Sequence, residues 1–170
     1  MKHIISALVE NKPGVLANVA GMFAARAFNI DSLAVGRTED PDLSRMTIVV
    51  VGDDRVLEQV RKQLAKLIPV VKVQDFAGQA VVARDLMLIT IAAPPEKRAE
   101  MLALIETFKG KVVDIGQKSI MVELSGPEEK IESFIEMCRP YGIKNVARTG
   151  TIAMPRQEKS AGATEGAGAE

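Results

Sequence analysis

The order in which apolar segments follow one another constrains the fold of this chain more than any other feature of the sequence. Residues 3–9 form a β-branched apolar run that is typical of a strand, and apolar residues recur at helical spacing over residues 15–27. Two further strand-like runs, a second helical pattern and a last strand then follow, at 30–35, 46–51, 54–67 and 70–76. The order β-α-β-β-α-β predicts the split βαβ pattern of ferredoxin-like folds.

The same order then recurs in the second half of the chain. We expect a strand at 85–92, a helix opened by Pro94-Pro95, and strands at 112–115 and 120–124. A second helix opened by residues 126–129 and a strand from Ile143 that extends to Ile152 complete the pattern. Pro13 matches Pro95 at an offset of 82 (95 − 13), and Gly52 matches Gly126 at an offset of 74 (126 − 52). The sequence therefore predicts an α+β protein of two ferredoxin-like (βαββαβ) domains in tandem.

The predicted boundaries follow from this repeat. We expect a first domain over residues 1–77, a linker over 78–83 and a second domain over 84–155. Residues 158–170 consist of Glu, Lys, Ser, Ala, Gly and Thr alone. Such a segment has nothing to bury against its ordering entropy, so a disordered tail is predicted over 156–170.

Composition argues against several classes of function. Lys plus Arg equals Asp plus Glu, 22 each, and a formal net charge of zero argues against a nucleic-acid partner. No apolar run is long enough for a membrane span and no signal peptide is evident, so a cytoplasmic protein is expected. The single histidine, His3, and the single cysteine, Cys138, leave little for a metal cluster or a catalytic triad. This composition argues against an enzyme.

The turn between the first strand and the first helix is the best candidate for a binding site. A strand that enters a helix through Gly14 leaves the amides of the first helical turn free to bind an anion, such as a carboxylate. Asn11 offers a carbonyl and an amide, and Val15, Leu16 and Ile30 offer an apolar wall. Together these residues would suit a small free amino acid with an aliphatic side chain.

Ordinary turn chemistry also accounts for these residues. Pro-Gly before a helix is usually a turn, and Asn29 suits the exit of the first helix because asparagine tolerates the left-handed conformation. The sheet edges favour side-by-side pairing of two such domains as a C2 dimer. A ligand at the first strand–helix turn would then lie near the seam between the two copies.

Several segments resemble one known family. These are Asn11–Leu16 and Phe28–Leu33, joined by Asp42–Ile48, Leu57–Leu64 and Val146–Gly150. The first domain resembles an ACT domain, and the chain over about residues 1–155 resembles the regulatory small subunits of acetolactate synthase (acetohydroxyacid synthase). The similarity is most specific through residue 76.

The resemblance implies a regulatory role. Small subunits of this family have no active site; they bind the catalytic large subunit, raise its activity and confer feedback inhibition by valine. The large subunit carries thiamine diphosphate, Mg²⁺ and FAD. The family's effector lies between paired ACT domains, and its contact positions correspond here to Asn11, Gly14 and Asn29, with Val15, Leu16 and Ile30 nearby. Leucine or isoleucine could replace valine as the effector.

The sequence also bears on three other functions. A stand-alone amino-acid sensor acting on a transcriptional partner would use the same ligand site without a large subunit. A single-strand RNA binder would need exposed aromatic residues on its central strands, and residues 4–9 and 46–51 contain none. An independent enzyme is disfavoured by the near absence of histidine and cysteine.

Overall fold

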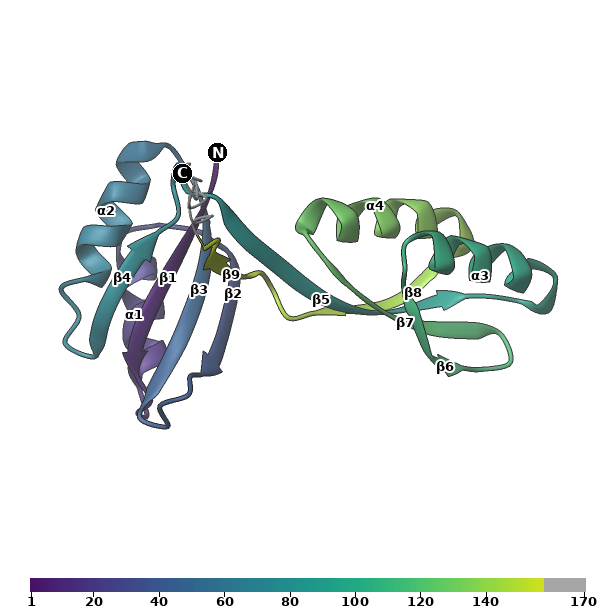
Figure 1. Cartoon of the computed structure of the whole chain (residues 1–170), viewed down its shortest axis with the longest axis horizontal. Coiled ribbons are helices and arrows are strands. Elements are labelled where there is room, and N and C mark those ends of the chain that lie inside the picture. The colour runs from purple at the N-terminus through teal and green to yellow at the C-terminus, as the bar shows by residue number, and fades with distance from the viewer. Residues whose placement is uncertain (158–170) are drawn as a thin grey trace, which may run out of the picture.

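The computed structural model describes residues 1–157 and contains two antiparallel sheets, one in each half of the chain (Figure 1). The first unit is built from β1 (Lys2–Glu10), α1 (Val15–Ala25), β2 (Ile30–Arg37), β3 (Leu43–Val51), α2 (Asp54–Leu64) and β4 (Val70–Asp75). Its strand order is β2-β3-β1-β4, which leaves β2 and β4 as edges. Both helices lie on the side of this sheet that faces away from the second unit.

The core of the first unit lies between this sheet and its two helices. On α1 the buried residues are Val15, Val19, Met22 and Phe23, which share one helical face. On β1 the fully buried Ile5, Ala7 and Val9 alternate with residues of the opposite face. With little aromatic content, the core consists almost entirely of aliphatic side chains and methionine.

The second unit repeats the architecture. It contains β5 (Val81–Ala92), a 3₁₀ turn (Pro95–Lys97), α3 (Arg98–Thr107), β6 (Lys111–Ile115), β7 (Ser119–Gly126), α4 (Glu128–Cys138), a 3₁₀ turn (Arg139–Tyr141), β8 (Ile143–Arg148) and β9 (Ile152–Pro155). The strand order is β6-β7-β5-β8. The predicted α+β fold of two tandem ferredoxin-like domains is confirmed.

The connection between the units differs from the prediction. β5 begins at Val81 rather than Asp85, so residues 81–83 of the expected linker are strand. This early part of β5 pairs with β9, from Val81 opposite Pro155 to Arg84 opposite Ile152. The expected single last strand is therefore split at Gly150, which has a positive φ of 82°. The long β5 strand runs from one unit into the other (Figure 1).

Two further expectations concern helices and the end of the chain. Among the residues that the structure describes, no helix is long and apolar enough to cross a membrane. The predicted disordered tail lies, from residue 158 onward, outside the described residues.

Candidate functional site

The start of α1 is open in this structure. Gly14 precedes the helix with φ 84° and ψ −12°, in the left-handed region that glycine enters without strain. A Cβ built on Gly14 meets nothing within 4 Å. No side chain caps the helix, and no acidic residue lies in its first turn. The positive end of the helix dipole is therefore available to an anion.

The other helix of the first unit shows what a closed start looks like. Asp53 precedes α2, and its Oδ1 accepts a hydrogen bond of 2.9 Å from the amide of Val56. Asp54 adds a second carboxylate in the first turn. Both features stabilise a helix start without a ligand. Helix α1 has neither of them, which makes its first turn the better place for a bound carboxylate.

Asn11 lies beside this turn, but part of its hydrogen-bonding capacity is already used. Its Nδ2 donates to the carbonyl of Pro41 (2.9 Å), and its backbone N–H donates to the carbonyl of Asp42 (2.7 Å). Asn11 thereby ties the β1–α1 turn to the turn between β2 and β3. The second N–H of Nδ2 and the Oδ1 acceptor of the exposed side chain remain, and Oδ1 suits an ammonium group.

The three apolar candidates differ in exposure. Val15 is 5% exposed and packs into the core, whereas Leu16 is 46% exposed on the outer side of the same turn. Ile30 is half-buried at the margin of the core. Leu16 is thus the apolar side chain that the β1–α1 turn itself offers to a ligand.

The expectation that Asn29 ends the first helix is wrong. Helix α1 ends at Ala25, and the chain leaves it through Arg26 and Ala27, whose φ is 54°. The amide of Phe28 then bonds to the carbonyl of Phe23 (3.1 Å). Asn29 lies beyond this closure, exposed, directly before β2. Its side chain is therefore not needed to terminate the helix.

Within one chain the candidates fall into two groups at opposite ends of the unit. Gly14 and Ile30 are separated by the whole of α1, whose 11 residues span about 16 Å. The strand register agrees: Ile30 lies opposite Val50, which pairs with His3 at the beginning of β1, whereas Asn11 directly follows the last residue of that strand. One small amino acid cannot contact both groups in a single copy.

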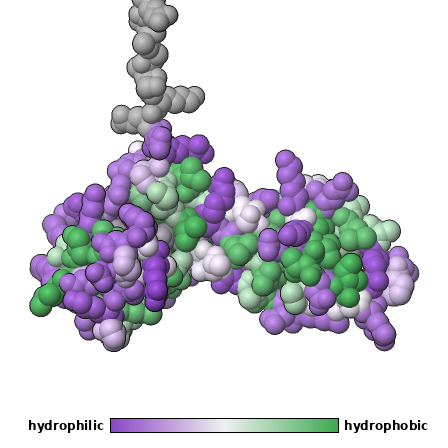
Figure 2. All heavy atoms as spheres, turned by 60° about the horizontal axis from the view of Figure 1, so that its bottom comes forward, coloured by the Kyte–Doolittle hydropathy of each residue, from purple (hydrophilic) through white to green (hydrophobic). Residues whose placement is uncertain are grey.

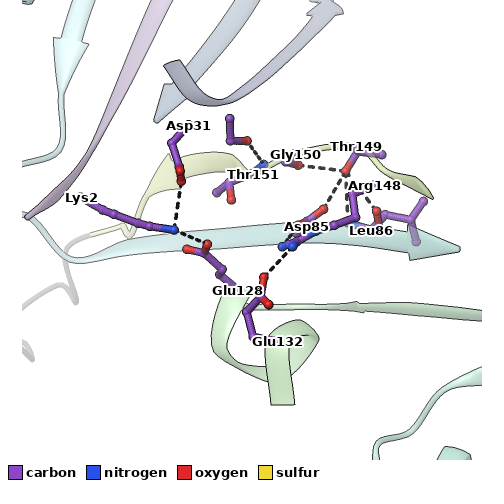
Figure 3. A network of polar contacts seen from close by, with 11 residues as sticks. Lys2, Asp31, Asp85, Leu86, Glu128, Glu132, Arg148, Thr149, Gly150 and Thr151 are labelled. Atoms are coloured by element: carbon purple, nitrogen blue, oxygen red, sulfur yellow. Dashed lines mark hydrogen bonds and ion pairs between the residues drawn. The ribbon is translucent and has the colours of Figure 1, made fainter. Parts of the chain in front are cut away.

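Sequence reasoning missed a polar cluster between the two units (Figure 3). The Nζ of Lys2 lies 3.0 Å from Oδ2 of Asp31 and also bonds to Glu128, 126 residues away in the sequence. These bonds raise the pKa of Lys2, with Glu128 as the largest cause and Asp31 next. Nearby, the backbone amide of Thr151 donates to Oγ of Ser32 (3.0 Å).

A buried carboxylate anchors the other side of this cluster. Asp85 is 2% exposed, and its Oδ2 accepts bonds from Nε (2.8 Å) and Nη2 (2.6 Å) of Arg148. The remaining Nη1 of Arg148 donates to Glu132 of α4 (2.6 Å). Burial lowers the pKa of Arg148, but its bonds to Glu132 and Asp85 outweigh this and raise it. A charged residue inside an apolar strand run was the one sequence signal for this pair.

A groove lies between strands β2 and β3 of the first unit and the paired strands β5 and β9. It has a volume of about 1000 Å³ and is lined by apolar residues such as Val35, Val82 and Met154, with Arg37, Arg45 and Arg84 among them. Hydrophobic residues also gather on the sheet face of the second unit that faces away from α3 and α4 (Figure 2), where Leu86 and Leu88 are about 40% exposed.

The remaining chemical candidates have structural roles. His3 is 8% exposed and its Nε2 lies 3.1 Å from the carbonyl of Gly52. Cys138 is fully buried, and burial raises the pKa of its thiol to about 11. Within residues 1–157 no group of three or more His, Cys, Asp or Glu residues is arranged to hold a metal ion.

The sequence matches the models of a known protein family. Residues 5–72 match the model of the AHAS small subunit-like ACT domain, and residues 84–157 match that of the small subunit of acetolactate synthase. A Bacillus subtilis acetolactate synthase small subunit is 46% identical over 157 residues, covering 92% of this chain and 91% of the relative. The Mycolicibacterium smegmatis small subunit is 44% identical over 163 residues, covering 96% of each.

A solved structure is also similar. The crystal structure of the acetolactate synthase small subunit from Thermotoga maritima superimposes with a TM-score of 0.86 at 40% identity. The match covers 94% of this chain and 99% of that one. Agreement of two family models, two relatives and one structure over nearly the whole chain leads to a single assignment. The chain belongs to the family of acetolactate synthase small subunits.

Proposed function

We propose that this chain is the regulatory subunit of an acetolactate synthase, which raises the activity of a catalytic large subunit and makes that activity sensitive to valine. The observation that carries the proposal is the open start of α1 at Gly14, in a chain of this family. Thiamine diphosphate, Mg²⁺ and FAD would belong to the large subunit. The complex would work in the cytoplasm, in branched-chain amino acid biosynthesis.

Effector binding is assigned to the first domain, residues 1–77. The valine carboxylate would bind at the first-turn amides of α1, where Gly14 allows close approach to the backbone. The ammonium group would bind the free Oδ1 of Asn11, and the isopropyl group would pack against Leu16. Val15 supports this turn from the core, where it is buried.

Asn29 and Ile30 would contribute from a second copy of the chain. They lie at the opposite end of α1 from Gly14, so in one copy they are too far away to contact the same valine. Strand β2 is an edge that begins at Ile30 and ends at Arg37, on the side of the β1–α1 turn. If two β2 edges pair antiparallel about a two-fold axis, the start of one strand lies beside the β1–α1 turn of the other.

This arrangement explains how a small ligand can act on a large complex. Each of two identical sites would join the β1–α1 turn of one copy to the start of β2 in its partner, so valine would stabilise one arrangement of the homodimer. A ligand shifts an equilibrium only by its differential affinity for the two arrangements. The large subunit would respond to that shift.

An activity assay tests the proposal. The large subunit is assayed with and without this chain, and the mixture is titrated with valine, leucine and isoleucine. We expect higher activity with the chain present and inhibition by valine. No activation and no inhibition would overturn the proposal. Binding of valine without any effect on the large subunit would favour a stand-alone sensor with another partner.

A further inference from the structure

The first residues of β2 are set apart from the rest of the strand by an irregularity. Ile30 lies opposite Val50 and Ser32 opposite Val49, so Asp31 has no partner residue on β3. An extra residue of this kind forms a bulge, which redirects a side chain and is common beside functional sites. Here the Asp31 carboxylate points out of the sheet toward Lys2 of β1 (Figure 3).

The first connection to the second unit runs through this carboxylate. Lys2 lies between Asp31 and Glu128 and bonds to both. Glu128 is the first residue of α4. A single ammonium group therefore links the start of β2 in the first unit to the start of a helix in the second.

The second connection runs through Ser32. Its Oγ accepts a hydrogen bond from the amide of Thr151, which is 8% exposed. Gly150 packs so closely that a Cβ on it would lie 2.6 Å from the same Oγ, and its φ is 82°. Arg148, two residues before Gly150 in the chain, bonds to the buried Asp85 and to Glu132 of α4.

Both connections end on one helix and on one face of it. Glu128 and Glu132 are four residues apart on α4, so their side chains lie one turn above the other. Among residues 1–157, the hydrogen bonds and ion pairs of side chains that join the first domain (1–77) to the second (84–155) are Lys2–Glu128 and Ser32–Thr151. Polar coupling between the domains is concentrated at this cluster.

We propose that Asp31 and Ser32 are positioning residues that transmit occupancy of the effector site to α4 of the second domain. They directly follow Asn29 and Ile30, so a ligand that moves or fixes the start of β2 acts on both connections at once. The inference rests on the proposed function, because it needs an effector at that site. It assigns a route to the coupling between the ACT domain and α4, which runs through the bulge.

The test separates binding of valine from its effect. The Asp31→Asn/Ser32→Ala chain is assembled with the large subunit, valine binding is measured by calorimetry, and inhibition is measured by activity. We expect a valine Kd within about threefold of the wild type and loss of at least about half of the maximal inhibition. Glu128→Gln, a change in the second domain, should produce the same loss.

Matched controls and a second measurement make the outcome decisive. Asp75→Asn removes another ion pair of the first unit, to Arg61, that does not reach the second domain, and it should keep full inhibition. Hydrogen exchange over residues 128–138 should change with valine in the wild type and in Asp75→Asn, but not in the double variant. A thermal melt confirms that each variant is folded.

The contrary results are distinct. Full maximal inhibition and a wild-type exchange response in the double variant would overturn the inference and leave the proposed function standing. Loss of valine binding itself in that variant would also overturn it, because the two residues would then belong to the binding site. If the wild-type complex ignores valine, the proposed function fails and this inference fails with it.

Discussion

The two units share one order of strands and helices but differ at the start of their first helix. In the first unit, α1 follows Gly14, with an open backbone and no side-chain cap. In the second, α3 has no side-chain cap either, but it follows Pro94-Pro95 and an extra 3₁₀ turn and carries Glu100 in its first turn, where α1 has no acidic residue. Proline has no N–H to offer a ligand. The same fold can therefore leave a helix start open to an anion in one unit and close it in the other.

The largest expected effect comes from the two cores. Phe23 and Phe134 are the largest fully buried side chains of their units, at 1% and 0% exposed. Replacing either by alanine should reduce the free energy of unfolding by about 3–5 kcal/mol. Phe23→Ala should also weaken valine binding, since Phe23 anchors α1 itself in the core, whereas Phe134→Ala should spare it. Urea melts and calorimetry measure both quantities.

Together, Phe23→Ala and Phe134→Ala test whether valine binding depends on the first unit alone. If Phe134→Ala weakens valine binding as much as Phe23→Ala does, the effector site is not confined to the first unit.

The next largest effect is expected at the start of α1. Gly14→Asp should lower valine affinity by at least about 100-fold, because it places a negative charge at the proposed carboxylate position and forces a side chain into the left-handed region. Calorimetry measures the affinity. Gly14→Ala isolates the backbone cost, since its Cβ would meet nothing within 4 Å.

Lys97→Asp is the matched control in the second unit. It places the same carboxylate at the start of α3, where it also removes a positive charge, and should leave valine affinity unchanged. Equal losses in Gly14→Asp and Lys97→Asp would show that charge alone, and not the site at α1, decides binding.

How much the sequence revealed depends on the range of the interaction. Gly14 was found because a glycine between a strand pattern and a helical pattern is a local signal. Asn29 was assigned to the helix exit because asparagine often takes that role, but Ala27 adopts the left-handed conformation instead. Local preference was overridden by the packing of Phe28 against Phe23 (ring centroids 6.3 Å apart).

The interdomain cluster was beyond the reach of local patterns. Lys2 and Glu128 are exposed charged residues at the ends of their elements, and nothing in either segment signals that they meet. Strand β9 was missed for the same reason, since its pairing with the early part of β5 is settled by contacts across about half the chain. The repeated element order, by contrast, was sufficient for the fold.

A smaller effect concerns the capped helix of the first unit. Asp53→Ala removes the acceptor for the Val56 amide and should reduce the free energy of unfolding by about 1 kcal/mol. Valine affinity should not change, because the proposed effector site lies at the start of α1 and not at α2. Thermal melts and calorimetry give the two values. A loss of valine affinity comparable to that of Gly14→Asp would mean that the two helix starts have been assigned the wrong roles.

The smallest effect concerns the interdomain lysine. The pKa of Lys2 is raised above its ordinary value of 10.5 by Glu128 and Asp31. Its contribution is therefore fully present below that value and is lost as the pH rises through the folded-state pKa. Because Lys2 is 47% exposed, the effect should be about 0–1 kcal/mol.

Lys2→Met provides the comparison. Urea midpoints of wild type and Lys2→Met should differ slightly near neutral pH and converge in strongly alkaline buffer or in high salt. A difference that grows with pH would contradict the sign worked out for this group.

The central claim is that each effector site is shared between two copies of the first unit, and mixed dimers test it most directly. Gly14→Asp damages one half of the site and Asn29→Ala the other. A dimer with one chain of each kind keeps one intact site, formed by Gly14 of one chain and Asn29 of its partner. Calorimetry of isolated mixed dimers should then give one valine per dimer with wild-type affinity, although neither variant binds valine well alone. No recovery of binding in the mixed dimer would contradict the shared site.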